Sequence, residues 1–330
     1  MWGYKITCLN IFKSLIILNI DKMMIKTPKR LMAFSALLCI AYLVANTLLM
    51  GFSLSTILVT TFVWCAFNVS VSIQKLVVAF LPIILFVLIY DFMRVYPNYM
   101  VNPIDTKGLY DLEMQLFGFN STNGTLIPSE YFNNNHWIIT DILSGIFYLC
   151  WVPLPIVYGL YLYFTKQKRI CIRFTSAFLL VNLIGFAGYY IHPAAPPWYV
   201  MQYGFVPDFS IGGHVAGFAR FDEFFNCGIF NMLYCKNSNV FAAVPSMHSA
   251  YVPVALYYAF VAKRNYLWIA VLLFVSVGIW FSAVYSGHHY IIDVILGALC
   301  AVIGLLLFEF VLLKIKSVAH LYERVANYLD

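Results

Sequence analysis

Long apolar stretches recur along this sequence, and they limit its fold more than any other feature. A helix that crosses the hydrocarbon core of a bilayer needs about 20 mostly apolar residues. The stretches that approach or exceed this length lie at roughly 31–50, 54–70, 76–96, 139–164, 172–191, 248–262, 267–286 and 289–313. The second and the sixth are the shortest. We therefore expect an all-α, polytopic transmembrane helix bundle of about eight helices.

The composition indicates that lipid is the solvent for most of the chain. Of the 330 residues, 62% are hydrophobic and 10% are charged, whereas about 25% of the residues in a soluble domain are charged. The 24 Tyr and 29 Phe residues suit helices that face acyl chains and lipid headgroups. These proportions exclude a water-soluble globular domain.

The placement of basic residues predicts the orientation of the helices. Lys and Arg concentrate in the cytoplasmic loops of membrane proteins. If the chain crosses eight times from a cytoplasmic N-terminus, sixteen of its 20 basic residues lie inside. The others are Arg94, Lys107, Arg220 and Lys236. We therefore expect both termini in the cytoplasm, where the net charge of +6 meets anionic headgroups and no nucleic acid is needed to explain it.

The chain is predicted to contain one transmembrane domain, residues 31–313, between two inner segments. A cytoplasmic or interfacial segment, 1–30, precedes it, and a cytoplasmic tail, 314–330, follows it. Two polar stretches, 97–138 and 192–247, interrupt the apolar pattern and are expected to form outer loops. Loops of this length are usually functional or disordered, so they are candidates for a substrate site.

Three shorter segments carry expectations of their own. Residues 6–20 are typical of an amphipathic or interfacial helix, unless translation starts at a later methionine. The Pro, Trp and Tyr residues of 192–199 indicate an ordered interfacial cap. Cys227 and Cys235 lie in the second outer loop and would pair only if that compartment is oxidising.

Two histidines and one aspartate stand where apolar helices begin. Residues four apart share a helix face, so Asp293 can hold one ring nitrogen of His289 and leave the other free as a nucleophile. His248 opens the sixth helix, and the sixth and eighth helices both start at the outer surface. Helix N-termini attract anions. The sequence therefore predicts a metal-free phosphoryl-transfer site, although each residue alone also suits a helix cap or a structural pair.

The same residues carry a family resemblance. Pro245-Ser246-Met247-His248 and His289-Tyr290-Ile291-Ile292-Asp293 resemble the second and third motifs of the type 2 phosphatidic acid phosphatase superfamily. Within it, the chain is most similar to the inositol phosphorylceramide synthase branch, the aureobasidin A target family of fungi, which bacteria also contain. Pro-Pro-Trp-Tyr at 196–199 and Ala-Arg-Phe-Asp at 219–222 point to this branch. The resemblance covers roughly residues 85–300.

The resemblance implies a fold, a mechanism and roles for the three residues. The fold would be a six-helix core with additional N-terminal helices. His289 would be the nucleophile that forms a phosphohistidine, Asp293 its orienting partner and His248 the general acid. No cofactor and no metal is expected.

The chain departs from the phosphatases at the residues that bind phosphate. Their third motif has Ser-Arg where this chain has Ser282 and Ala283, and their first motif, a Lys followed by Arg-Pro, is absent near His192. Positive ligands for the phosphate must therefore come from elsewhere. Arg220 is the first candidate and His192 a weaker one. Arg94 is a further candidate, although an arginine three residues after an aspartate, here Asp91, more often forms an intrahelical ion pair than a phosphate ligand. No role was evident for His288.

The predicted function is a lipid phosphotransferase at the outer membrane face, which is the periplasm in a bacterium or the Golgi lumen in a eukaryote. Inositol phosphate would move from phosphatidylinositol to ceramide, and diacylglycerol would leave. Another headgroup is an alternative, as is hydrolysis by a lipid phosphate phosphatase. A transporter is a third reading, because His and Asp within membranes also relay protons. Regulatory subunits and the oligomeric state are left open.

Overall fold

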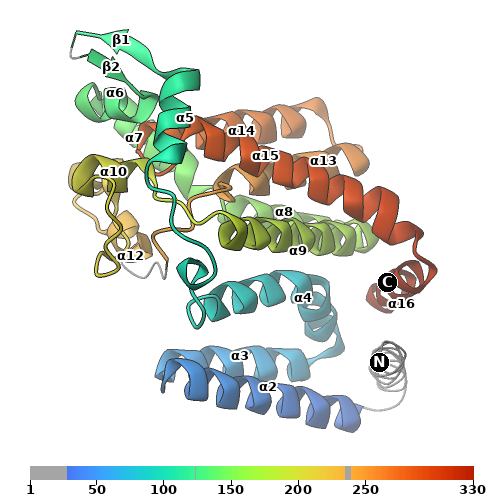
Figure 1. The fold of residues 1–330 in the computed structure, drawn as a ribbon. Helices are drawn as coiled ribbons and strands as arrows, with labels where there is room; N and C mark the ends of the chain where they lie inside the picture. Colours follow the sequence, from blue (N-terminus) through green and yellow to red (C-terminus); the bar gives the residue numbers. More distant parts are fainter. Residues whose placement is uncertain (1–27, 123, 235–238) are drawn as a thin grey trace, which may run out of the picture. The chain divides into compact units, whose positions relative to one another are not determined.

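The computed structural model describes residues 28–122, 124–234 and 239–330. These residues form helices, apart from one small antiparallel hairpin of β1 (Phe119–Ser121) and β2 (Gly124–Leu126), which lies beside helix α6 (Pro128–Asn134; Figure 1). The all-α prediction is confirmed. The helix predicted over 6–20 and Cys235 lie outside the described residues.

The chain forms two compact units, one that ends at Val77 and one that begins at Val78. The first contains helices α2 (Pro28–Met50) and α3 (Leu54–Val69), which pack together as a hairpin. The side chain of Ser53 caps α3 by accepting a hydrogen bond from the Thr56 amide at 3.3 Å. Helix α4 (Val71–Phe92) starts in this unit and continues in the second.

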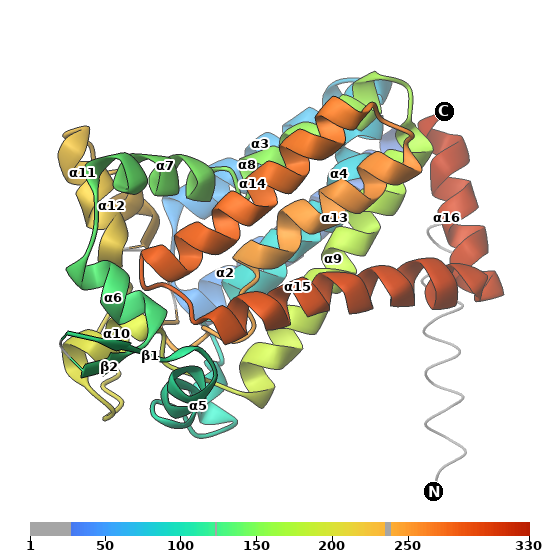
Figure 2. The same ribbon diagram turned by 90° about the horizontal axis from the view of Figure 1, so that it is seen from above.

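The second unit is a helix bundle built around a short central helix, α13 (His248–Val261). Helices α8 (Pro153–Phe164), α9 (Lys168–Ile191), α14 (Tyr266–Tyr285) and α15 (Ile291–Leu306) all contact it. Figure 2 shows α13 lying between α14 and α15. Small buried residues such as Ala250 and Ala255 allow these neighbours to approach closely.

Several helices are long and apolar enough to cross a membrane, so the chain is a polytopic membrane protein. In the described part of the chain, five single helices meet this condition, and α7 (Ile138–Leu149) with α8 makes a sixth if the bent pair is one span. The second and sixth predicted spans are the short helices α3, of 16 residues, and α13, of 14 residues. A total of eight crossings and cytoplasmic termini therefore stay predictions.

One predicted helix is broken in the structure. The sequence suggested a single helix over 139–164, but α7 ends at Leu149 and α8 begins at Pro153, with a bend of 45° between them. Proline has no amide hydrogen and clashes with the preceding turn, so it is tolerated at the first position of a helix and ends a helix that precedes it. The single-helix prediction was wrong at this point for that reason.

The last span leads into an amphipathic helix. After α15 the chain forms a π-helical turn (Leu307–Val311) and a 3-10 turn (Leu312–Lys314), and then helix α16 (Lys316–Leu329), which covers most of the predicted tail. Glu309 in the π turn pairs with Arg173 of α9 and accepts a hydrogen bond from Tyr258 of α13. These bonds join three helices at the end of the bundle opposite the two outer loops.

The described parts of the two predicted outer loops contain short helices. They comprise η1 (Asn98–Met100), α5 (Gly108–Phe117), α6, α10 (Pro197–Tyr203), η2 (Ala216–Phe218), α11 (Ala219–Phe224) and α12 (Ile229–Tyr234). Helices α5, α6, α10, α11 and α12 gather at one end of the bundle (Figure 2). Asn98 ties this cap together, because its buried amide donates to the carbonyls of Tyr189 (2.8 Å) and Phe241 (2.9 Å).

Candidate active site

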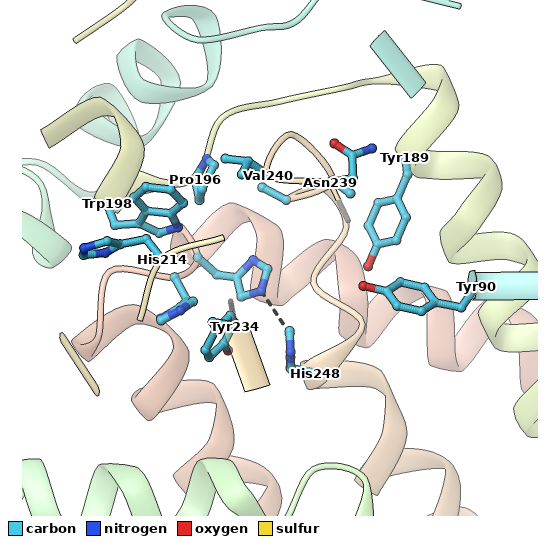
Figure 3. A pocket seen from close by; sticks show the side chains of 13 residues that line it. Tyr90, Tyr189, Pro196, Trp198, His214, Tyr234, Asn239, Val240 and His248 are labelled. Atoms are coloured by element: carbon cyan, nitrogen blue, oxygen red, sulfur yellow. Dashed lines mark hydrogen bonds between the residues drawn. The ribbon is translucent and has the colours of Figure 1, made fainter. Parts of the chain in front are cut away.

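The structure brings the three predicted catalytic residues into one hydrogen-bonded chain. Nδ1 of His248 lies 3.0 Å from Nε2 of His289, and Nδ1 of His289 lies 3.3 Å from Oδ2 of Asp293. Figure 3 marks the contact at His248. His289 is 5% exposed and Asp293 is fully buried. The pair that the sequence predicted forms, but α15 begins at Ile291 and not at His289, so His289 lies just before the helix and Asp293 lies in its first turn.

The hydrogen-bond partners indicate which nitrogen of His289 is free to react. A carboxylate only accepts hydrogen bonds, so we assign a proton to Nδ1 of His289, where it faces Asp293. Nε2 then carries the lone pair and accepts a hydrogen bond from His248. An imidazole held in this tautomer presents a nucleophilic nitrogen, and His248 lies beside it as a proton donor.

A carboxylate from the first outer loop caps α15, the helix that begins two residues after His289. Glu113 of α5 is 1% exposed, and its two oxygens accept the amides of Ile291 (2.9 Å) and Ile292 (3.2 Å). Oδ2 of Asp293 accepts the amide of Tyr290 at 2.9 Å. The sequence analysis assigned the N-terminus of this helix to phosphate. That assignment needs correction, because protein carboxylates already occupy these amides.

Burial shapes the charge state of this capping residue. It raises the pKa of Glu113 to about 7, while the two backbone amides lower the pKa and the charge of Asp293 raises it further. Glu113 therefore titrates near neutral pH, next to the helix end that positions the nucleophile.

A glycine allows the two catalytic helices to touch. A Cβ atom at Gly297 of α15 would lie 1.9 Å from the carbonyl oxygen of Ser246 and 2.3 Å from Oγ of Ser249. The amide of Ser246 donates to the carbonyl of Asp293 at 2.9 Å. This close approach holds the start of α13, with His248, beside the first turn of α15.

A tight turn between α14 and α15 carries the adjacent histidines His288 and His289. Gly287 has φ of +75°, a conformation that favours glycine. The amides of His288 and His289 both donate to the carbonyl of Ala283 at 3.1 Å. The cap holds this turn, because the amide of Trp198 donates to the Gly287 carbonyl at 2.8 Å. The turn thus fixes both histidines relative to the cap.

A cavity of about 80 Å³ opens beside the hydrogen-bonded chain. The residues that line it are Tyr90, Tyr189, Pro196, Trp198, His214, Tyr234, Asn239, Val240, Ala242, Ala243, His248, His288 and His289. Figure 3 shows the hydroxyl groups of Tyr90 and Tyr189 facing each other on one side, and Trp198 with His214 on the other. Four of the described lining residues are histidines, and none of them is Lys or Arg.

The three predicted phosphate ligands lie outside the lining of this cavity. Nε of Arg220 donates to Oδ1 of Asp141 at 2.6 Å, and its guanidinium lies 5.3 Å from the ring centre of Tyr285. One of its terminal nitrogens, Nη2, is buried without a partner among the described residues. Arg220 as a phosphate ligand therefore stays a prediction, and the structure adds a role as the partner of Asp141.

The other two candidates form ion pairs near the surface. Nε2 of His192 lies 3.2 Å from Oδ2 of Asp105, and the His192 side chain is 48% exposed. Arg94 pairs with Asp91 at 3.1 Å, which is the alternative that the sequence analysis left open. Their binding of phosphate likewise stays a prediction.

The sequence analysis missed two histidines that line the cavity. His288 was given no role, although it directly precedes the nucleophile. His214 stacks on Trp198 with 5.2 Å between ring centres, and its Nδ1 accepts the amide of Ala216 at 2.9 Å. Burial lowers the pKa of His214. The adjacency of His288 to the third motif was the only signal for either residue in the sequence.

Comparison with known proteins supplies the family. The model of the PAP2 superfamily matches residues 122–307, more than half of the chain, and this range contains His248, His289 and Asp293. The chain belongs to the PAP2 superfamily. The phosphoinositol dihydroceramide synthase of Bacteroides thetaiotaomicron is a similar protein. It is 53% identical over 256 residues, which cover 78% of this chain and 84% of that protein.

Fungal proteins are more distant relatives within the PAP2 superfamily. The inositol phosphorylceramide synthase of Candida albicans is 26% identical over 70% of this chain and 47% of its own length. The catalytic subunit of inositol phosphorylceramide synthase from Saccharomyces cerevisiae is 28% identical over 66% of this chain and 53% of its own length. The chain thus spans about half the length of these fungal relatives. No solved structure matches it at a significant level.

Proposed function

We propose that this protein is a lipid phosphotransferase that moves inositol phosphate from phosphatidylinositol to a ceramide-type alcohol and releases diacylglycerol. The hydrogen bonds that join His248, His289 and Asp293 support phosphoryl transfer. The extensive similarity to a phosphoinositol dihydroceramide synthase is the observation that favours these substrates. Most Lys and Arg residues lie in the segments predicted to be cytoplasmic, which supports a site on the outer face of the membrane.

In the first half-reaction, Nε2 of His289 attacks the phosphorus of the donor. The N–P bond forms and the bond from phosphorus to the diacylglycerol oxygen breaks, and that oxygen takes the proton of His248. The proton on Nδ1 of His289 stays there and is donated in a hydrogen bond to Asp293, whose negative charge stabilises the positive charge of the ring. The donor must first separate the two histidines, because they are hydrogen-bonded to each other at 3.0 Å.

In the second half-reaction, the hydroxyl group of the acceptor gives its proton to His248 and attacks phosphorus. The N–P bond breaks, and His289 returns to its starting state. The same two histidines therefore serve both steps with their proton roles reversed. This balance requires no metal ligand or redox group.

Hydrolysis is the second candidate, because water can replace the acceptor alcohol in the second step. Aromatic residues of the cap, including Trp198 and Tyr199, are buried around the site. Such a lining restricts bulk water and favours an alcohol delivered from the bilayer. Well-placed reactants gain effective molarities of about 10⁵ M or more, which exceeds the roughly 55 M of water.

The decisive experiment incubates purified protein with phosphatidylinositol labelled in the inositol ring, with and without ceramide. We expect labelled inositol phosphorylceramide, and diacylglycerol release that rises when ceramide is added. The His289→Ala variant serves as the inactive control. Equal diacylglycerol release without ceramide, with free inositol phosphate as the product, would place hydrolysis first.

Arg220 is our first candidate among the predicted positive ligands of the donor phosphate. Its unpartnered Nη2 supports this role, and a guanidinium can serve a carboxylate and a phosphate at once where Lys offers one nitrogen. We expect Arg220→Lys to raise KM for phosphatidylinositol more than Asp141→Asn does. The latter variant removes only the charge of the carboxylate partner. Equal effects of both variants would assign Arg220 to structural pairing alone.

A further inference from the structure

His288 has a buried nitrogen that faces the cavity without a partner. Its side chain is among the residues that line the cavity, and only 5% of the residue is exposed. Nε2 makes no hydrogen bond of good geometry among the described residues, and the backbone of His214 is the group close enough to act on the ring. Buried polar atoms are nearly always hydrogen-bonded, and one without a well-placed partner is costly. A ligand that supplies a hydrogen-bond acceptor at this position removes that cost.

We propose that His288 is a substrate-binding residue whose Nε2–H donates a hydrogen bond to a nonbridging oxygen of the phosphodiester in the donor lipid. This inference rests on the proposed function, and it names a ligand for the phosphate beside the nucleophile. The ligand is the phosphate group that all glycerophospholipid diesters share, so the inference does not depend on the inositol ring.

The other side of the ring supplies the right tautomer. Nδ1 of His288 lies 3.0 Å from Oγ of Ser286, and this hydroxyl lies 3.3 Å from the carbonyl of Ala283. When the serine donates to Nδ1, the proton of the neutral ring sits on Nε2 and faces the cavity. When the ring is charged, Nδ1–H donates to the serine, which donates to the carbonyl. When the serine donates to Ala283, it can also accept from Nδ1–H of a neutral ring, and Nε2 then carries a hydrogen only after the ring takes up a second proton. A phosphate anion at Nε2 favours the states in which Nε2 carries a hydrogen.

Aromatic packing holds the ring in place and keeps it neutral when the cavity is empty. The ring centres of Tyr234, Phe218 and Tyr148 lie 4.3, 5.1 and 6.0 Å from that of His288. Burial holds the pKa of His288 well below its usual value, the neighbouring His289 lowers it further, and the His214 backbone acts in the opposite direction. A neutral ring avoids the free-energy cost of burying a charge. A bound anion then favours protonation of the ring.

The two adjacent histidines are thereby given different tasks. His289 has a carboxylate on Nδ1 and a proton donor at Nε2, which suits a nucleophile. His288 has a hydroxyl on Nδ1 and lines the cavity, which suits a hydrogen-bond donor to a bound group. A residue that only binds the donor should act mainly on KM for that donor.

Three substitutions of His288 separate binding from packing. His288→Phe keeps an aromatic ring and removes both nitrogens. His288→Gln places an amide nitrogen near the position of Nε2, whereas His288→Asn reaches only the position of Nδ1. A hydrogen bond to a charged group contributes about 1.5–3 kcal/mol, which corresponds to roughly 10- to 150-fold in affinity. The exposed His320 on α16 provides a matched control, His320→Gln.

We expect His288→Phe and His288→Asn to raise KM for phosphatidylinositol at least tenfold, with little change in KM for ceramide. His288→Gln should stay within about threefold of the wild type, as should the control. Saturable binding of tritiated phosphatidylinositol in mixed detergent micelles, measured in the His289→Ala background, tests the inference without turnover. Equal affinity of the His288→Phe, His288→Gln and parent proteins would overturn it. Failure of the wild type to make a phosphorylceramide product would instead overturn the proposed function, because the binding assay needs no product.

Discussion

At the scale of single residues, the site depends on where three protons lie. Asp293 fixes one proton on His289, His248 offers a second to the same ring, and Glu113 takes up a third near neutral pH. These protons lie on side chains from three segments: α5 in the first outer loop, the start of α13 and the residues just before α15. Substitutions of His289 and His248 should therefore change the chemistry, whereas a substitution of Glu113 should also change stability.

His289, His248 and Asp293 should behave as one unit when they are replaced. We expect His289→Ala and His248→Ala each to lower the initial rate of diacylglycerol release by about 10³-fold or more, because each removes a required proton or electron pair. The double variant should lose little beyond His289→Ala. Rates that multiply in the double variant would show that the two rings act independently, and near-normal activity in correctly inserted His289→Ala would remove its assignment as nucleophile.

Glu113 should make stability depend on pH between about 4.5 and about 7, its ordinary and its folded pKa. The folded state binds the proton more tightly, so this contribution to stability is fully present below the lower value and is lost as pH rises through the upper one. Glu113→Gln removes the titration and keeps one acceptor for the α15 amides. We expect the apparent Tm of the wild type in detergent to fall relative to this variant from pH 5 to pH 8. Parallel Tm curves would contradict the titration.

The sequence was sufficient to predict contacts in the site between residues that are close together along the chain. It was insufficient to predict contacts between residues that are far apart. His289 and Asp293 are four residues apart across the start of α15, and the motif around His248 is equally local. Glu113 lies 178 residues before the amide that it caps, and no local pattern predicts that contact. For Arg220, the sequence showed an isolated cation, but only the fold shows that Asp141 lies against it.

At the scale of elements, the contact between α13 and α15 sets the distance between the two histidines. The cap holds the turn that follows α14 through the amide of Trp198. A bend of 45° separates α7 from α8, and α7 carries Asp141, the partner of Arg220. The prolines that end one helix and start the next were visible in the sequence. Their effect was underestimated because a long apolar run also suits one continuous span.

Replacement of Gly297 by Ala should push these two helices apart. A methyl group there meets the Ser246 carbonyl, so we expect a loss of about 1–3 kcal/mol from overpacking, which outweighs the better helix propensity of Ala, about 1 kcal/mol. The apparent Tm and the rate of transfer should both fall. Gly212→Ala is the control, because a Cβ atom there meets nothing within 4 Å. A Gly297→Ala protein as stable and active as this control would show that the contact can relax freely.

At the scale of the whole molecule, composition alone was enough to predict an all-α membrane protein. The number of crossings was harder to predict, because a 14-residue helix such as α13 depends on its neighbours rather than on its own length. An ordered cap was predicted from residues 192–199, but its individual helices were not. These helices are short, and contacts with residues far away in the chain stabilise them.

Cysteine labelling should establish how the molecule sits in the membrane. In a cysteine-free background, Lys107→Cys and Ser210→Cys should react with an impermeant maleimide from the outer side, and Lys316→Cys should react only after permeabilisation. The reason is the asymmetric distribution of basic residues. Labelling of positions 107 and 210 from opposite sides would contradict the topology, and early labelling of position 316 would place the C-terminus outside.

The ion pair between Arg173 and Glu309 has a consequence for biosynthesis. The ribosome delivers Arg173 to the translocon 136 residues before its partner. A charge at the centre of a lone inserted helix costs about 2.5–3.5 kcal/mol on translocon scales, and snorkelling toward headgroups reduces that cost nearer the end. Helix α9 therefore carries an unmatched cation until the π-helical turn with Glu309 has been synthesised. A nascent chain that stops before Glu309 lacks the carboxylate that pairs with this cation.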